Sequence, residues 1–289
     1  MNSTQRMIKY CAMAFAIILA IGIISGMASI VFTIINSVSG NSEQFDFKIN
    51  KRNHAYTNYD REFEEVKSIK VDNRIGSLHI LIGDGFRVEA QNVSKEFEAK
   101  VNGDGRLTIH DVGGNFKFLW FNIGGVPSTK SDITIYVPSD FVAKEVLIDT
   151  GAGSTSLEGI QTDYLYIEAG AGNINASGVV AKKVKWDGGV GSATFREVRF
   201  EESSFDCGVG NLEVNGKLLG VTDVDCGVGE VRLDINGSAQ DYGYNVDTGI
   251  GRITWNSEKI SGKSNGDADN IIKVDGGVGS VEIEFTNNR

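Results

Sequence analysis

The sequence is poor in proline, cysteine and histidine. Its 289 residues include 36 glycines but only 2 prolines, 3 cysteines and 3 histidines. Cys11 falls in an apolar N-terminal run, and no Cys-x-x-Cys motif or Cys/His cluster occurs, which argues against a disulfide scaffold or a zinc site. His54, His79 and His110 are too scattered for a Ser/His/acid or Cys/His arrangement. We therefore predict no catalytic residue and no bound cofactor.

The chain also lacks a basic face. Its formal net charge is −10, and residues 1–39 hold only two charged residues, Arg6 and Lys9, so the remainder carries −12. Nucleic-acid binding needs clustered Lys and Arg to contact phosphates. We therefore expect no nucleic-acid partner and no association with an anionic lipid surface. Cations and basic partners remain open, as does a simple role of the charge in solubility.

Long uncharged runs are absent except at the N-terminus, where no charged residue occurs between Lys9 and Glu43. Residues 12–35 are apolar and long enough to cross a hydrocarbon core of ~30 Å as a helix. A cleaved signal peptide is the alternative, although its apolar region is usually only about 7–15 residues; a buried helix is another. Because Arg6 and Lys9 precede the run, we expect a single-pass cell-membrane protein with a cytoplasmic N-terminus and an extracellular C-terminal domain.

These observations divide the chain into three parts. We expect a cytoplasmic stub with the transmembrane helix at 1–38 and a juxtamembrane linker at 39–65, with a short helix or a first strand near its end. The remaining residues, 66–289, carry the repeats described next.

The glycines belong to a repeated phrase, acid-x-Gly-x-Gly. Five copies begin 19 residues apart, and two more follow after gaps of 22 and 28 residues. The acids that open them are Asp149, Glu168, Asp187, Asp206, Asp225, Asp247 and Asp275. A fixed period of this length is typical of stacked structural units.

Apolar and polar residues alternate on both sides of each phrase, as in Glu230-Val-Arg-Leu233. Period 2 indicates strands with one buried face, and glycine allows the chain to bend between them. The sequence therefore predicts an all-β fold, a single-stranded parallel β-solenoid with coils of about 19 residues, preceded by one N-terminal transmembrane helix. We expect the longer gaps to be loop insertions, the second at 261–270. The phrase-like stretch around Asp72 lies close to four periods before Asp149 and predicts earlier, degenerate coils.

The N-terminal span, the opening Val66–Asp72, the Ile135–Pro138 segment and the serial Gly-x-Gly strands together resemble the bacterial putative-adhesin family. That family is a toast-rack-like repetitive β domain of unknown function, common in Gram-positive envelope proteins. The resemblance covers roughly residues 66–286. It implies the fold and an envelope location, and some relatives look like accessory proteins of envelope stress responses.

The repeated acids are the candidate metal ligands, since stacked carboxylates would repel one another unless something offset the charge. Extracellular calcium could bridge them through Asp149, Glu168, Asp187, Asp206 and Asp225. The interpretation we favour is structural: each carboxylate accepts hydrogen bonds from the backbone amides of its own glycine corner.

Two other features stand out. Cys207 and Cys226 occupy the same position of adjacent coils and could pair, although the small residues of that column favour reduced core thiols. The stretch 111–131 interrupts the repeat and is either a protruding hairpin or a cap. If its aromatic cluster is exposed, it is the candidate partner surface, comprising Phe116, Phe118, Trp120 and Phe121.

These patterns favour a non-enzymatic envelope protein that binds or senses an envelope protein or glycan. The alternative is a carbohydrate-active β-helix enzyme acting on an extracellular polysaccharide. Such a site needs unlike groups that converge in one place, whereas the acids here are equivalent by position. Signalling across the membrane by protein–protein contact is a third hypothesis.

Overall fold

The computed structural model describes residues 56–111, 115–118, 121–124, 130–264 and 268–286. The transmembrane helix expected at residues 12–35 lies outside these ranges. Within them, no helix is long and apolar enough to cross a membrane.

Nearly all of the described chain is β-strand. Sixteen strands form one continuous sheet, and β6 and β7 pair only with each other. The elements are β1 (Thr57–Phe63), β2 (Ser68–Gly83), β3 (Phe86–Val93), β4 (Glu98–Val101), β5 (Arg106–Asp111), β6 (Asn115–Phe118), β7 (Phe121–Gly124), β8 (Ser131–Pro138), β9 (Val142–Glu158), β10 (Gln161–Ser177), β11 (Val180–Leu218), β12 (Val221–Asn236), the 3-10 helix η1 (Ala239–Asp241), β13 (Tyr242–Asp247), β14 (Ile250–Trp255), β15 (Glu258–Lys259), β16 (Gly262–Ser264), β17 (Asn270–Asp275) and β18 (Val278–Thr286).

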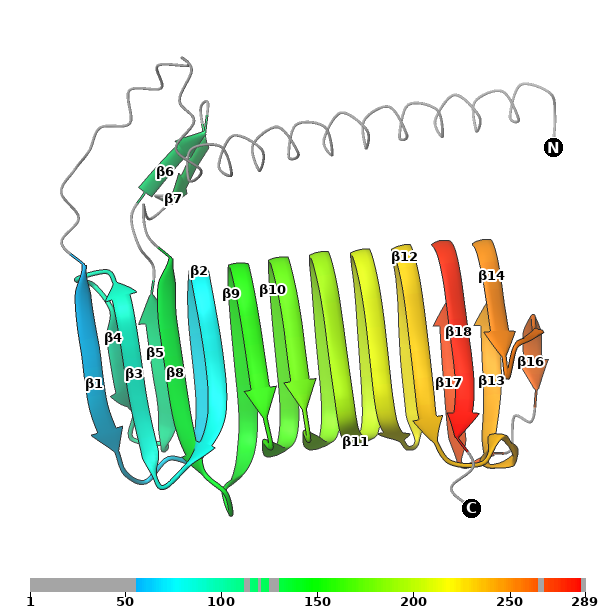
Figure 1. The fold of residues 1–289 in the computed structure, drawn as a ribbon, viewed down its shortest axis with the longest axis horizontal. Helices are drawn as coiled ribbons and strands as arrows, with labels where there is room; N and C mark the ends of the chain where they lie inside the picture. Colours follow the sequence, from blue (N-terminus) through cyan, green and yellow to red (C-terminus); the bar gives the residue numbers. More distant parts are fainter. Residues whose placement is uncertain (1–55, 112–114, 119–120, 125–129, 265–267, 287–289) are drawn as a thin grey trace. The chain divides into compact units, whose positions relative to one another are not determined.

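The predicted β-solenoid is confirmed in its central part, where successive coils lie side by side (Figure 1). β10 pairs in parallel with β9 on one side and β11 on the other, and each residue meets the one 19 positions away. Every coil bends at its glycine phrase, so its two halves belong to two layers. Beyond β12 the two layers are formed by separate strands: the first half of β12 pairs with β17, and its second half pairs with β18.

Glycine is required at the corner because neighbouring backbones approach too closely for a Cβ atom. Gly172 has a φ of +149°, and a Cβ there would clash with the carbonyl oxygen of Gly153 on the coil before. The same conflict recurs at the second glycine of the other phrases. The missing side chain therefore fixes glycine at this position, and the positive φ adds to the requirement at every phrase except that of Gly251.

The core lies between the two layers and follows the period-2 pattern. In β10, Leu165 and Ile167 of the first half and Ile174 and Ala176 of the second are all buried. The centre of the solenoid is filled by aromatic rings; the Phe195 and Phe205 centroids are 5.6 Å apart. Burial of these columns, at about 25 cal/mol per Å² of apolar surface, stabilises the stack.

The N-terminal coils do not follow chain order. Asp72 does not lie four coils before Asp149; the two residues pair directly, because β2 is the immediate neighbour of β9. The chain between Asp72 and Asp149 forms the next coil, on the other side of β2. This coil consists of β5 and β8, which both pair in parallel with β2. The interpretation of this region as serial degenerate coils is therefore wrong, although the strands expected near 86–90, 106–110 and 132–137 exist as β3, β5 and β8.

The C-terminal coils are also interleaved. After β12 the chain passes through η1 and forms the outermost coil from β13 and β14, then returns to insert β17 and β18 between that coil and β12 (Figure 1). The two longer repeat gaps are therefore crossings with their own structure. The second gap contains β15 and β16, which pair antiparallel with β14 and β13.

Antiparallel strands occur at both ends of the stack. β3 pairs antiparallel with β8, β1 with β3, and β4 with β5, so the strand expected near the end of the linker is β1. An open sheet edge invites pairing with another chain. Short strands such as β16, and the charged strand β1 (TNYDREF), reduce that tendency at the two ends.

We predict that Gly191→Ala destabilises the fold by about 3 kcal/mol or more, because its Cβ would meet the Gly172 carbonyl oxygen at a φ of +144°. The control is Gly178→Ala, where φ is also positive (+64°) but the nearest atom would be 3.6 Å away; it should cost only about 1 kcal/mol. Urea unfolding followed by circular dichroism measures both. Equal losses would contradict the close-approach explanation.

Candidate functional site

The structure brings the repeated acids together in one row on the outside of the first layer. Asp72 pairs with Asp149, which pairs with Glu168. The row continues in the order Asp187, Asp206, Asp225, Asp275 and Asp247. We call these eight residues the acid ladder. Its last two members are in reverse chain order because the C-terminal coils are interleaved.

The hydrogen bonds of the ladder differ from those expected from the sequence. Among the described residues, Asp247 is the only ladder member to accept from an amide of its own corner, at 3.4 Å from Gly249 N. The corner backbones continue in register with the coils on either side, so their N–H groups are directed toward the neighbouring strands. The interpretation that each carboxylate accepts hydrogen bonds from the amides of its own corner is therefore wrong.

The N-terminal half of the ladder is partly compensated by other side chains. The Tyr166 hydroxyl donates to Glu168 Oε2 at 3.0 Å or to Asp187 Oδ2 at 2.9 Å. Lys185 Nζ lies 2.8 Å from Asp187 Oδ2 and 5.3 Å from the centre of the Tyr166 ring. These acceptors and the low polarity around its hydroxyl raise the pKa of Tyr166, with burial the largest cause.

At the N-terminal end, His110 Nδ1 lies 3.1 Å from Asp72 Oδ2. Sequence analysis missed this contact. It depends on β5 lying beside β2, and that neighbour relation does not follow from the repeat period.

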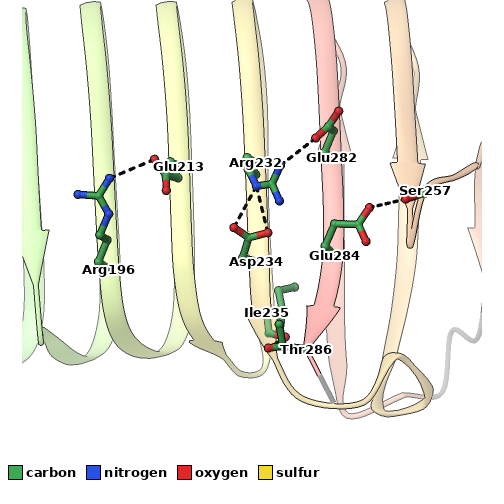
Figure 2. Close-up of polar contacts among 9 residues, drawn as sticks. All are labelled: Arg196, Glu213, Arg232, Asp234, Ile235, Ser257, Glu282, Glu284 and Thr286. Carbon is green, nitrogen blue, oxygen red and sulfur yellow. Dashed lines mark hydrogen bonds and ion pairs between the residues drawn. The ribbon is translucent and has the colours of Figure 1, made fainter. Parts of the chain in front are cut away.

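The C-terminal half of the ladder lacks ion pairs among the described residues. In the part of the chain that the structure describes, Asp206, Asp225 and Asp275 have no Lys, Arg or His partner within ion-pair distance. The carboxylates of the second layer are different, as Figure 2 shows. There three acids have arginine partners: Arg196 Nη2 lies 3.4 Å from Glu213, and Arg232 contacts both Asp234 (3.0 Å) and Glu282 (3.3 Å). A fourth, Glu284, accepts a hydrogen bond from the Ser257 hydroxyl at 3.1 Å.

Burial and the neighbouring charges change the acidity of two ladder carboxyls. Burial, followed by the charges of Asp206 and Asp275, raises the pKa of Asp225. Burial, followed by Asp72 and Glu168, raises the pKa of Asp149. The raised pKa values of these two carboxyls mean that their ionisation weakens the fold.

The ladder places the calcium candidates in a line, one carboxylate per coil. Among the described residues, no three His, Cys, Asp or Glu side chains converge to hold a metal ion. Calcium takes six to eight oxygen ligands. A bridging cation would therefore depend mainly on water.

Cys207 and Cys226 lie directly opposite each other on adjacent coils. Both are free thiols, as expected, with Cys207 buried and Cys226 half-buried. Burial raises the pKa of both thiols, that of Cys226 to about 11. Neither is therefore an activated nucleophile.

The interruption at 111–131 is a hairpin in its described backbone, with Phe116 opposite Ile123 and Phe118 opposite Phe121. The side chains of the four candidate aromatic residues lie outside the described structure. The hairpin leaves from the end of β5 and returns at the start of β8, in place of a glycine corner.

A hollow of about 400 Å³ lies near the second irregular segment, beside residues 268–270. Its size is in the range of small-ligand sites, and its polar wall includes Lys217, Gln240 and Asp241. The wall is partly fixed: the Tyr242 hydroxyl donates to the Leu218 carbonyl at 2.7 Å, and Asn270 Oδ1 accepts from Gly220 N at 2.8 Å.

Comparison with protein families identifies the domain. The Toastrack DUF4097 family matches residues 66–284, and the chain belongs to this family. This confirms the resemblance to a toast-rack-like family that the sequence indicated. No curated protein matches the chain.

Several solved structures are similar to this chain at low identity. A putative adhesin from Bacteroides fragilis is 14% identical over 79% of this chain and 96% of its own, with a TM-score of 0.44. One from Parabacteroides distasonis is 15% identical over 80% and 98%, with a TM-score of 0.39. A putative cell adhesion protein from Clostridium sporogenes is 15% identical over 80% and 100%, with a TM-score of 0.32.

Asp225→Asn should raise the stability at pH 7 by about 0.5 kcal/mol, or roughly 1–2 °C in thermal midpoint, because it removes one exposed, screened charge from a row of like charges. The folded-state pKa of Asp225 is raised, so stability is lost as pH rises through it, and the gain should vanish below about pH 4. The matched control is Asp234→Asn, which should lower the midpoint because Arg232 loses one of its two carboxylate partners. A destabilising Asp225→Asn at pH 7 would contradict repulsion.

Calcium should shift the thermal midpoint no more than sodium or magnesium chloride at equal ionic strength, because the ladder offers no cluster of three ligands. A chelator should have no effect. Scanning calorimetry provides the measurement, with Asp206→Asn/Asp225→Asn as the variant in which a genuine site would be lost. A calcium-specific rise that this variant abolishes would establish a metal site.

Proposed function

We propose that the chain is a non-enzymatic, single-pass membrane protein whose solenoid lies outside the cell and binds or senses an envelope component, in an adhesin-like or envelope-stress role. The observation that carries the proposal is the row geometry of the solenoid. Equivalent side chains recur at the strand spacing of about 4.8 Å along the stack. A rigid surface of repeated groups suits recognition of an extended partner by many weak contacts.

Two further observations support this function. The apolar run at residues 12–35 is long enough to serve as an anchor, and the preceding Arg6 and Lys9 favour a domain outside the cell. The similar solved structures are described as putative adhesins, which agrees with a binding role but names no target. The partner would be an envelope protein or a glycan, contacted through the solenoid surface, the hairpin at 115–124 or the hollow near 268–270.

Crosslinking in intact cells tests the proposal. A photoreactive amino acid placed on the outer faces of the solenoid should give discrete crosslinks to an extracytoplasmic component. The same label at the buried position Leu165 is the control and should give none. Protease added outside the cell should digest the solenoid and leave a short membrane fragment. Protection of the solenoid in intact cells, with digestion only after lysis, would refute the topology.

The carbohydrate-active alternative gains no specific support from the geometry. Incubating the purified full chain with envelope and plant polysaccharides provides the discriminating assay. Release of reducing ends or unsaturated products would replace the binding function with an enzymatic one.

A further inference from the structure

One edge of the solenoid combines an exposed apolar row with the C-terminal half of the acid ladder. The bend between the two halves of each coil lies on the upper edge of the stack in Figure 1. The residue between the two glycines of each phrase belongs to this bend. In the last five coils these tips are aliphatic and in register. We call them the corner row; its members and their exposed fractions are Val190 46%, Val209 41%, Val228 50%, Val278 49% and Ile250 74%.

The corner can fold without an exposed β-branched residue at its tip, although five neighbouring coils have one. The equivalent tips in the two preceding coils are Ala152 and Ala171, and those corners have the same backbone form. The bend therefore does not depend on a β-branched residue at its tip. A contiguous apolar strip on a soluble surface usually marks an interaction site.

The negative charge beside the corner row restricts which kind of partner can bind there. Each aliphatic tip follows its ladder acid by three residues, and Asp206, Asp225, Asp275 and Asp247 are exposed. Nearby cations include Lys185, which is bound to Asp187, but none pairs with these four acids among the described residues. An anionic bilayer or a second copy of the same acidic edge would bring like charges together. A partner with an apolar strip flanked by Lys or Arg would relieve the repulsion.

The spacing of the rows favours a helical partner. Coils are about 4.8 Å apart, and one turn of an α-helix rises about 5.4 Å, so a helix lying along the edge drifts by only about 0.6 Å per coil. An extended strand repeats a face every ~6.6–6.8 Å and falls out of step after one or two coils. The cavity at the corner, lined by Trp186, Val190 and Val209, has a volume of only about 10 Å³, too small for more than one water. A partner would therefore lie on the surface of this edge without inserting a side chain into a pocket.

We propose that the corner row and the adjoining acids form a docking surface for a basic amphipathic helix of another polypeptide. The apolar stripe of the helix covers the valines, and its Lys or Arg side chains face Asp206, Asp225, Asp275 and Asp247. This inference deepens the binding function proposed above and rests on it, since it names the class of envelope partner.

Binding of a designed peptide tests the surface. The probe is an 18-residue helix of leucine and lysine with one apolar stripe, titrated into the full-length protein in zwitterionic nanodiscs, with empty nanodiscs subtracted. We expect saturable binding that weakens with added salt. Val209→Ser/Val228→Ser and Asp206→Asn/Asp225→Asn should each weaken it by about tenfold. The Asp-to-Asn pair should also reduce the salt dependence.

The opposite edge supplies the matched control. Val180 (40% exposed) and Val221 (39% exposed) are equally aliphatic, but they lie at the strand starts, away from the glycine corners. Val180→Ser/Val221→Ser should leave the affinity unchanged within about twofold. A peptide with glutamate in place of lysine, and one with the same composition in scrambled order, should not bind.

Several outcomes would overturn the proposal. These are no binding above empty nanodiscs, equal loss from changes at the two edges, or equal affinity for the glutamate peptide. Concentration-dependent dimerisation that Val228→Asp abolishes would assign the edge to a second copy, and insertion of Val228 into lipid would assign it to the bilayer. Cellular crosslinks that map to other faces would refute the docking surface while leaving the broader binding function intact.

Discussion

The fold depends on the close approach of successive backbones at the glycine corner. Where Gly191 passes Gly172, the second chain occupies the space that a Cβ would need. This contact allows the two halves of each coil to turn within a few residues and places consecutive coils in exact register. The buried columns and the outer rows both follow from that register, because every residue meets its equivalent on the next coil.

The same register creates the main electrostatic cost of the structure. Stacking equivalent positions is favourable for Leu165 or Ile167 in the core and unfavourable for a carboxylate outside it. The protein offsets this cost unevenly. Tyr166 and Lys185 compensate the middle of the ladder, and arginines pair with Glu213, Asp234 and Glu282 of the second layer. The C-terminal ladder acids are left exposed beside an aliphatic row. That unevenness distinguishes one edge of an otherwise repetitive surface and suggests where a partner binds.

The terminal coils of a strand stack have a neighbour on one side only and can fray. In this chain the coils at both ends are interleaved. At each end a coil that is distant in sequence is inserted next to the regular stack: β2 lies beside β9, and β17 and β18 lie beside β12. The chain must therefore pass over the outermost coil to reach the inserted one, which holds the outermost coil in place. Antiparallel strands cover its outer side. Fraying of a terminal coil would require this crossing to separate as well. The hairpin and the polar hollow occur where the repeat is broken.

Much of the candidate site could be predicted from the repeat. A period of 19 residues places Asp149 beside Glu168 and Cys207 beside Cys226, and the structure has both pairs. The partners of the acids could not be predicted. Asp72 meets Asp149 and His110 only because a long segment folds outward. The amides expected to bind the acids are directed to neighbouring coils, an effect of the sheet that a single phrase does not reveal.

The sequence by itself determined the all-β solenoid, the corner glycines and the rows of like residues, because each depends on short-range periodicity. The tertiary structure decided the order of the coils at both ends and which acids find a partner. It also decided that the valines between the glycines are exposed. These properties depend on contacts between residues distant in the chain, and alternation along a strand carries no information about them.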